Sequence, residues 1–121
     1  MDITFSIFPK FYKHLSAQEL ASLVREVGLD TTNLVVRDGY WVRPDHLAED
    51  VPKFVKTMDA AGVEVRFATA GFSAGQIIHD DAPLRVLADN GITEFRMGYF
   101  RGGDKSPADA LAEDRAQMCQ V

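Results

Sequence analysis

The sequence is poor in the features that mark secreted and membrane proteins. It has one cysteine, Cys119, so no disulfide can form within the chain. No apolar run approaches the roughly 20 residues that a membrane-spanning helix needs. Residues 1–4 lack the basic and apolar regions of a signal peptide. These absences favour a cytoplasmic protein without a membrane partner.

Positive charge is also scarce. The sequence has 13 lysines and arginines against 18 aspartates and glutamates, which gives a net charge of −5. Surfaces that bind nucleic acid are normally basic, because they neutralise phosphates. We therefore expect no nucleic-acid partner.

The sequence does contain an ordered series of predicted strands. Apolar and β-branched runs, bounded by polar loops, predict four of them. They are expected at residues 3–8, in the run that begins at Leu34, at residues 63–68 and at residues 93–100. Residues 69–79, with two glycines, are expected to form a loop.

Helices are predicted between and after these strands. Capping residues and apolar positions at helical spacing mark their beginnings. They are expected over residues 17–27, from Asp50 to Gly62 with Pro52 in the first turn, from Asp80 or Asp81 to Gly91, and from Ser106 onward. The last helix is expected to direct an apolar set inward, namely Leu111, Ala112, Met118 and Cys119.

A glycine followed by an aliphatic residue ends each of the first three helices, at Gly28-Leu29, Gly62-Val63 and Gly91-Ile92. The spacing is close to the length of one βα unit. Residues 1–121 are therefore predicted to form a single α/β domain of four consecutive βα units with parallel strands.

Two folds use serial βα units, and the sequence favours a barrel over an open sheet. The first strand is followed by neither the acidic pair of a response-regulator receiver nor a Gly-rich phosphate loop. In the third and fourth strands, charged residues such as Glu64, Arg66, Glu94 and Arg96 alternate with apolar ones. Such alternation is expected where one face packs on helices and the other lines a polar barrel interior. We therefore predict half of a TIM (β/α)8 barrel.

Three segments carry a resemblance to a known family, namely residues 15–21 (LSAQELA), 36–44 (VRDGYWVRP) and 91–99 (GITEFRMGY). In this order and spacing, the chain resembles the sugar phosphate isomerase/epimerase group of xylose-isomerase-like TIM barrels. Family members have eight βα units, so the chain is similar to the N-terminal half. The resemblance implies a divalent metal (Mn, Mg, Zn or Co) only in the complete barrel, because its ligands lie on strands five to eight. No metal ligand is assigned to this chain.

Candidate substrate-binding residues follow the predicted strands. Lys10, Arg37 and Arg96 fall at or near carboxyl ends, which form the active-site face of a barrel. Cations there suit the phosphate or carboxylate of a sugar-like substrate. Trp41 and Tyr99 could stack on a sugar face.

Each of these candidates has a structural alternative. Arg96 could instead join a network of ion pairs with Arg66, Glu64 and Glu94 inside the barrel. The aromatic residues could instead pack over its mouth.

The remaining reactive residues favour structural roles. The cluster His79-Asp80-Asp81 is expected to be a helix N-cap rather than a metal site. Cys119 is expected to be a core residue rather than a nucleophile. Catalytic residues are not assigned.

The sequence leaves several functions open. The first is the N-terminal half of a metal-dependent sugar isomerase or epimerase that contributes substrate contacts, and that needs a second half for activity. The second is a non-catalytic half-barrel that pairs with itself and binds a small ligand. DNA repair of the endonuclease IV type is disfavoured by the acidic charge. Because a half-barrel has two exposed strand edges, we expect a homodimer.

Overall fold

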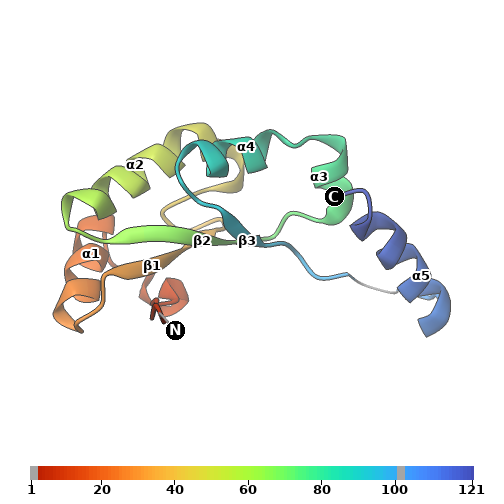
Figure 1. Cartoon of the computed structure of the whole chain (residues 1–121), viewed down its shortest axis with the longest axis horizontal. Helices are drawn as coiled ribbons and strands as arrows, with labels where there is room; N and C mark the ends of the chain where they lie inside the picture. The colour runs from red at the N-terminus through yellow and green to blue at the C-terminus, as the bar shows by residue number, and fades with distance from the viewer. Residues whose placement is uncertain (1–2, 101–102) are drawn as a thin grey trace.

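The computed structural model of the chain describes residues 3–100 and 103–121 (Figure 1). Strands and helices alternate along these residues. In chain order they are η1 (Pro9–Tyr12), α1 (Ala17–Glu26), β1 (Thr31–Val36), η2 (Pro44–His46), α2 (Leu47–Ala60), β2 (Glu64–Ala70), α3 (Ala74–His79), α4 (Ala82–Asp89), β3 (Glu94–Arg96) and α5 (Pro107–Met118).

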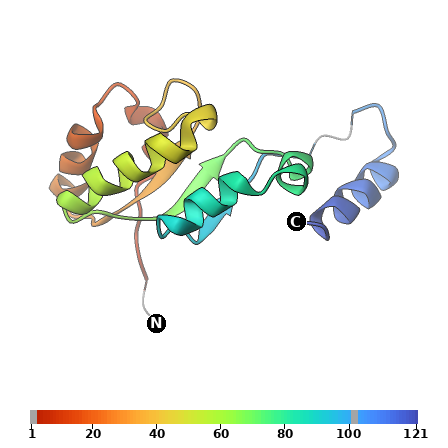
Figure 2. The same cartoon turned by 90° about the horizontal axis from the view of Figure 1, so that it is seen from above.

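The three strands form one parallel sheet in the order β1-β2-β3. Helix α2 connects β1 to β2, and α4 connects β2 to β3. Figures 1 and 2 show α2 and α4 over the same face of the sheet. The predicted α/β class with parallel strands is confirmed. None of the helices in the described residues is both long and apolar enough to cross a bilayer.

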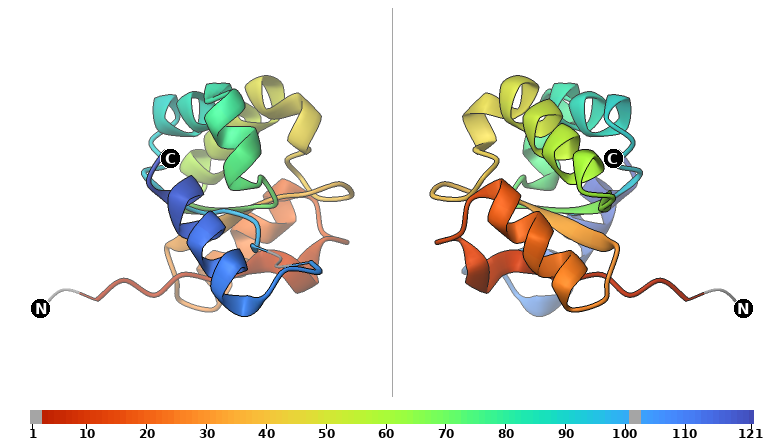
Figure 3. Two further views of the ribbon diagram at one scale, coloured as in Figure 1. Left: turned by 90° about the vertical axis from the view of Figure 1, so that its right-hand side faces the viewer. Right: turned by 90° about the vertical axis from the view of Figure 1, so that its left-hand side faces the viewer.

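The strand predicted at residues 3–8 is reduced to a single bridge. Ile7 pairs in parallel with Thr32, donating its N–H to the carbonyl of Thr31 at 3.1 Å and accepting from the N–H of Asn33 at 2.9 Å. Ile3 and Phe5 are 67% and 70% exposed. The prediction of a full strand was wrong because these apolar side chains meet no second layer of the fold. Figure 3 shows the segment leaving the body of the molecule.

The loop predicted at residues 69–79 contains helix α3. Ser73 accepts a hydrogen bond from the N–H of Gln76 at 3.2 Å, and the Gln76 side chain accepts from the N–H of Ser73 at 2.8 Å. This reciprocal capping box is visible in the sequence as a serine followed three residues later by a glutamine. The two nearby glycines had favoured the prediction of a loop.

Strands β2 and β3 differ from their predicted form. The pairs Thr32–Val65 and Leu34–Ala68 leave one extra residue in β2. Such a bulge interrupts the alternation of faces. As a result, Phe67 is half-buried and lies outside the hydrophobic core. The alternation of charged and apolar residues in the sequence had predicted that it shares the inner face of Val65. Strand β3 covers only residues 94–96 of the predicted 93–100.

The glycine repeat is confirmed as a repeated helix end. Each glycine has a positive φ between 73° and 84°, a conformation that is costly for any residue with a Cβ. The following aliphatic N–H donates back into the last helical turn, in the pattern of a Schellman motif. The bonds run from Leu29 to Val24, from Val63 to Met58 and from Ile92 to Leu87.

The hydrophobic core lies between the sheet and its helices. Leu20 and Val24 of α1, Leu34 of β1, and Val51 and Met58 of α2 are all fully buried in it. Their spacing puts one apolar stripe of each helix against the sheet. This core holds β1 and β2 in place and so sets the positions of the loops that follow them.

Helix α5 is confirmed, but its predicted inward face is wrong. Leu111, Ala112, Met118 and Cys119 are exposed. Helix α5 contacts α3, and the half-buried residues on it are Ala110, Asp114 and Gln117. Unlike α1, α2 and α4, helix α5 does not separate apolar from polar residues onto opposite faces, because Arg115 shares the face of Leu111 and Met118.

An ion pair between the exposed Arg43 and the buried carboxylate of Asp50 fastens the loop after β1 to helix α2. Arg43 donates to Asp50 three times, from its backbone N–H at 3.0 Å, from Nε at 2.9 Å and from Nη2 at 3.1 Å. Only 8% of the Asp50 side chain is exposed. The Arg43 side-chain bonds outweigh the effect of burial and lower the pKa of Asp50 to about 2. Asp50 was predicted to cap α2, but the helix begins at Leu47, which leaves Pro52 inside it.

The pair makes a prediction about stability and pH. The pKa of Asp50 is lower in the folded chain than the unfolded value of about 4. Its contribution is therefore present above pH 4 and is lost as the pH falls towards 2. We expect Asp50→Asn to lower the free energy of unfolding at pH 7 by about 2 kcal/mol and to flatten its dependence on pH between about 4 and 2.

Urea unfolding at several pH values measures this effect. The control is Asp59→Asn, which removes an exposed carboxylate from the same helix. If Asp50→Asn and the control have equal stability at pH 7, the pair does not hold the loop.

Candidate functional site

An open cleft of about 700 Å³ lies at the carboxyl ends of all three strands. In a parallel sheet these ends meet at one edge, so the loops that follow the strands become neighbours. Four of the five predicted substrate-binding residues line this cleft, namely Lys10, Arg37, Arg96 and Tyr99. The sequence separation between Lys10 and Tyr99 shows that the fold, not local sequence, brings them together.

Lys10 and Arg37 lie on neighbouring segments that are hydrogen-bonded to each other. Lys10 lies on η1, and its carbonyl accepts a hydrogen bond of 2.8 Å from the Tyr40 hydroxyl. Arg37 follows β1 directly. Its carbonyl accepts from the N–H of Tyr40 at 3.2 Å in a turn that Gly39 completes with a φ of 81°. One tyrosine thus ties the two cationic segments together.

Arg96 stacks on an aromatic ring rather than joining the interior ion-pair network. Its guanidinium carbon lies 4.6 Å from the centre of the Tyr99 ring. Arg66 instead pairs with Glu64 of its own strand at 2.8 Å. Among the ion pairs of the described residues, none involves Lys10, Arg37 or Arg96. All three cations are therefore available to a ligand.

Gly98 determines how the chain leaves β3. Its N–H donates to the carbonyl of Phe72 at 2.8 Å. A Cβ added at Gly98 would lie 2.9 Å from the carbonyl oxygen of Gly71, which is too close for any real side chain. The two exit loops therefore touch through their backbones, and this contact directs the segment that carries Tyr99.

Trp41 is the predicted substrate-binding residue that does not line the cleft. Its indole N–H donates to the carbonyl of Leu15 at 2.9 Å, and its ring packs 5.9 Å from that of Phe54 on α2. Trp41 is therefore a packing residue, which is the structural alternative that the sequence offered for it. We therefore leave Trp41 out of the site.

Several cleft residues were not identified from the sequence. Aromatic rings and hydrogen-bonding side chains line the cleft beside the cations, namely Phe8, Asp38, Asp45, Phe72, Ser73 and Gln76. The capping box at Ser73 and Gln76 could have placed a short helix beside the cleft. Asp45 and Phe72 carry no such signal, because only the folded chain brings their loops to this edge.

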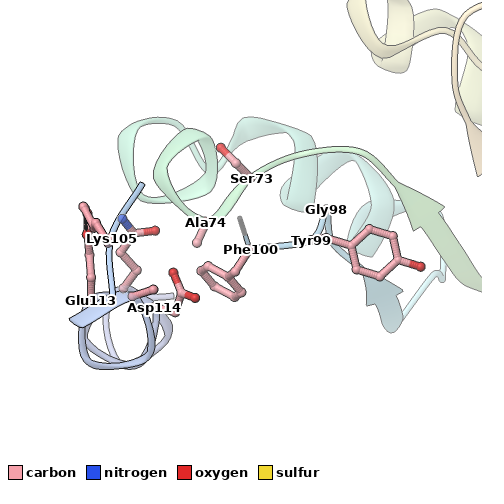
Figure 4. Close-up of a pocket in the computed structure, with 10 residues that line it drawn as sticks. Ser73, Ala74, Gly98, Tyr99, Phe100, Lys105, Glu113 and Asp114 are labelled. Atoms are coloured by element: carbon pink, nitrogen blue, oxygen red, sulfur yellow. Dashed lines mark hydrogen bonds and ion pairs between the residues drawn. The ribbon is translucent and has the colours of Figure 1, made fainter. Parts of the chain in front are cut away.

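A smaller cavity of about 170 Å³ adjoins the cleft between α3, the chain after β3 and α5 (Figure 4). In Figure 4, Tyr99 and Phe100 point to opposite sides of the chain, and Phe100 lies between α3 and α5. Lys105 forms an ion pair with Glu113 on its rim. Because the lysine that lines this cavity is already paired, the cavity is a weaker anion site than the larger cleft.

The cluster at residues 79–81 makes local contacts. Within the described residues, no group of three or more His, Cys, Asp and Glu side chains is arranged to hold a metal ion. Asp80 accepts from the N–H of Ala82, the first residue of α4, at 3.0 Å, whereas Asp81 at the N-cap position forms no side-chain capping bond. Asp81 pairs with Arg85 at 3.0 Å, and the hydrogen bonds from Arg85 lower the pKa of Asp81.

The chain matches no protein-family model and no curated protein sequence.

The contact at Gly98 predicts the effect of a methyl group. We expect Gly98→Ala to lower the free energy of unfolding by about 1–3 kcal/mol, because one of two touching backbones must move. We also expect it to displace Arg96 from Tyr99. NMR measures the second effect, since a guanidinium over an aromatic ring has ring-shifted side-chain protons.

The matched control is Gly75→Ala on α3, where the nearest atom to the added methyl is Ser73 Oγ at 3.9 Å. Alanine favours a helix over glycine by about 1 kcal/mol, so this variant should be at least as stable as the wild type. Unchanged Arg96 proton shifts in Gly98→Ala would show that Gly98 does not position the stack.

Proposed function

We propose that the cleft binds the anionic group of a sugar phosphate or a related sugar, and that the chain serves as the N-terminal half of a sugar isomerase- or epimerase-like barrel. The main support is the convergence of Lys10, Arg37 and Arg96 on one cleft. Each lies at or just beyond the carboxyl end of a different extended segment, as substrate contacts do in barrels. Guanidinium groups suit phosphate and carboxylate, because they can donate two parallel hydrogen bonds.

The rest of the cleft suits the sugar part of such a ligand. Phe8, Phe72 and Tyr99 provide apolar faces of the size of a sugar ring. Asp38, Asp45 and Gln76 provide groups that can hydrogen-bond to hydroxyls. Small-molecule sites combine apolar walls with a few polar groups in this way.

The half-barrel assignment is supported by the order of the extended segments. Residue Ile7 pairs with β1, β1 with β2, and β2 with β3, all in parallel and in sequence order. Consecutive helices α1 and α2, and then α2 and α4, contact each other. An open doubly wound sheet would instead have a change of direction in its strand order.

Isomerisation in this proposal requires more than the residues described. The resemblance implies a divalent metal whose ligands belong to the second half of the barrel. We therefore assign the residues of this chain no step of the chemistry. Lys10, Arg37 and Arg96 bind and orient the ligand, and catalysis depends on a completing half.

A second candidate function is a non-catalytic half-barrel that binds a small ligand after pairing with itself. Exposed apolar side chains at both sides of the sheet favour it. DNA binding of the endonuclease IV type is less well supported, because the chain carries a net charge of −5 and surfaces that bind DNA are normally basic.

The anion site makes a direct prediction for Arg37, which is exposed and takes part in none of the described ion pairs. We expect Arg37→Ala to weaken the binding of a pentose 5-phosphate about 10- to 100-fold, through the loss of a charge-assisted hydrogen bond. The melting temperature should stay nearly unchanged. Isothermal titration and thermal unfolding measure the two quantities.

Arg85→Ala is the control, because Arg85 is an exposed arginine that pairs with Asp81 away from the cleft. Its variant should bind as the wild type does. Equal affinities of the Arg37→Ala and Arg85→Ala variants would refute the anion site. A large loss of stability in Arg37→Ala would instead identify Arg37 as a structural residue.

A further inference from the structure

The segment that carries Lys10 has little local support. Element η1 is a single turn of four residues, and Phe8 at its N-cap position forms no side-chain capping bond. Apart from the half-buried Tyr12, residues 10–14 are exposed. A short, exposed 3-10 turn is marginal by itself, because each of its hydrogen bonds must fix several backbone angles. Contacts with other parts of the chain therefore decide where Lys10 lies.

Two adjacent aromatic residues in the loop after β1 provide such contacts. The Tyr40 hydroxyl donates to the carbonyl of Lys10 at 2.8 Å, and the Trp41 indole N–H donates to the carbonyl of Leu15 at 2.9 Å. The two rings meet edge to face, with centroids 5.9 Å apart and planes at 69°. This is a favoured geometry for aromatic pairs. The pair therefore binds residues 10–15 at both ends of that segment.

The aromatic pair is itself anchored to the core of the fold. The Trp41 ring packs 5.9 Å from the ring of Phe54, which is buried on α2. The next residue, Val42, is fully buried, and its carbonyl accepts a hydrogen bond of 3.0 Å from the N–H of Arg37. The loop that carries Tyr40 is thus fixed to both β1 and α2, and it can hold the more exposed η1 segment in place.

We propose that Tyr40 is a positioning residue of the cleft, which holds Lys10 beside the strand end that carries Arg37 so that both cations meet one anionic group. The hydrogen bond fixes the Lys10 backbone, and therefore the region that its ammonium group can reach. A cation placed in advance loses less conformational freedom when the ligand binds, which raises the affinity. This role rests on the proposed anion site, because Tyr40 does not line the cleft and acts only through Lys10.

The variant Tyr40→Phe removes the hydroxyl and keeps the ring that packs against Trp41. We expect its affinity for a pentose 5-phosphate to fall about 3- to 10-fold in isothermal titration, through the loss of one hydrogen bond. Tyr12→Phe is the matched control, since it removes a hydroxyl from η1 itself. Tyr12 does not line the cleft, and among the described residues its hydroxyl forms no hydrogen bond. This control should bind as the wild type does.

A double-mutant cycle separates positioning from a purely structural role. In the wild-type background, Lys10→Ala should weaken binding about tenfold. In the Tyr40→Phe background it should weaken binding no more than about threefold, because Lys10 is no longer held at the cleft. Arg37→Ala should weaken binding equally in both backgrounds, since Arg37 directly follows β1 and its carbonyl is bound by the backbone of Tyr40. A loss of stability alone would leave the effect of Lys10→Ala unchanged.

The hydrogen bond can also be followed without a ligand. In Tyr40→Phe, the NMR order parameters of the backbone at residues 10–13 should fall, whereas in Tyr12→Phe they should not change. Equal affinities of the two variants, or an equal effect of Lys10→Ala in both backgrounds, would overturn the positioning role and leave the anion site standing. A wild-type chain that does not bind the phosphate would refute the anion site and the positioning role together.

Discussion

Parallel strand pairing is the constraint on which the rest of the structure depends. It places the carboxyl ends of β1, β2 and β3 at one edge, so Arg37, Gly71 and Arg96 become neighbours. The repeated glycine turns keep each connection from a helix to the next strand short. A glycine with a positive φ reverses the chain within one residue, and the aliphatic residue after it leads into the next strand. The Arg43–Asp50 pair then fixes the loop after β1 to α2.

Much of this could be predicted from the sequence, since glycine turns and apolar stripes are local signals. That Lys10, Arg37, Arg96 and Tyr99 line one cleft was also predictable, because they lie at or near the carboxyl ends of predicted strands. What could not be predicted depends on contacts between distant residues. Trp41 packs on Leu15 and Phe54 rather than in the cleft, and the strand at residues 3–8 lacks a layer to pack against. The bulge in β2 likewise leaves no mark in the sequence.

Two segments departed from prediction in the same way. Ile3 and Phe5 in the N-terminal segment and Leu111 and Met118 on α5 were expected in a strand and on the inner face of a helix, yet all are exposed. Burial depends on which elements lie opposite a side chain, and contacts between distant residues decide that. In α5 the apolar residues also share their face with Arg115, so the local spacing was a weaker signal there than in α1 or α2.

The central claim is that residues from separate segments form one anion site. The most direct test is an NMR titration of the isotopically labelled wild-type chain with a pentose 5-phosphate, following the side-chain N–H signals of every arginine. The account predicts saturating shifts of the Arg37 and Arg96 signals with one common dissociation constant, while the Arg85 and Arg115 signals stay still. Equal, non-saturating shifts of all the arginines would mean general screening of charge and would contradict the account.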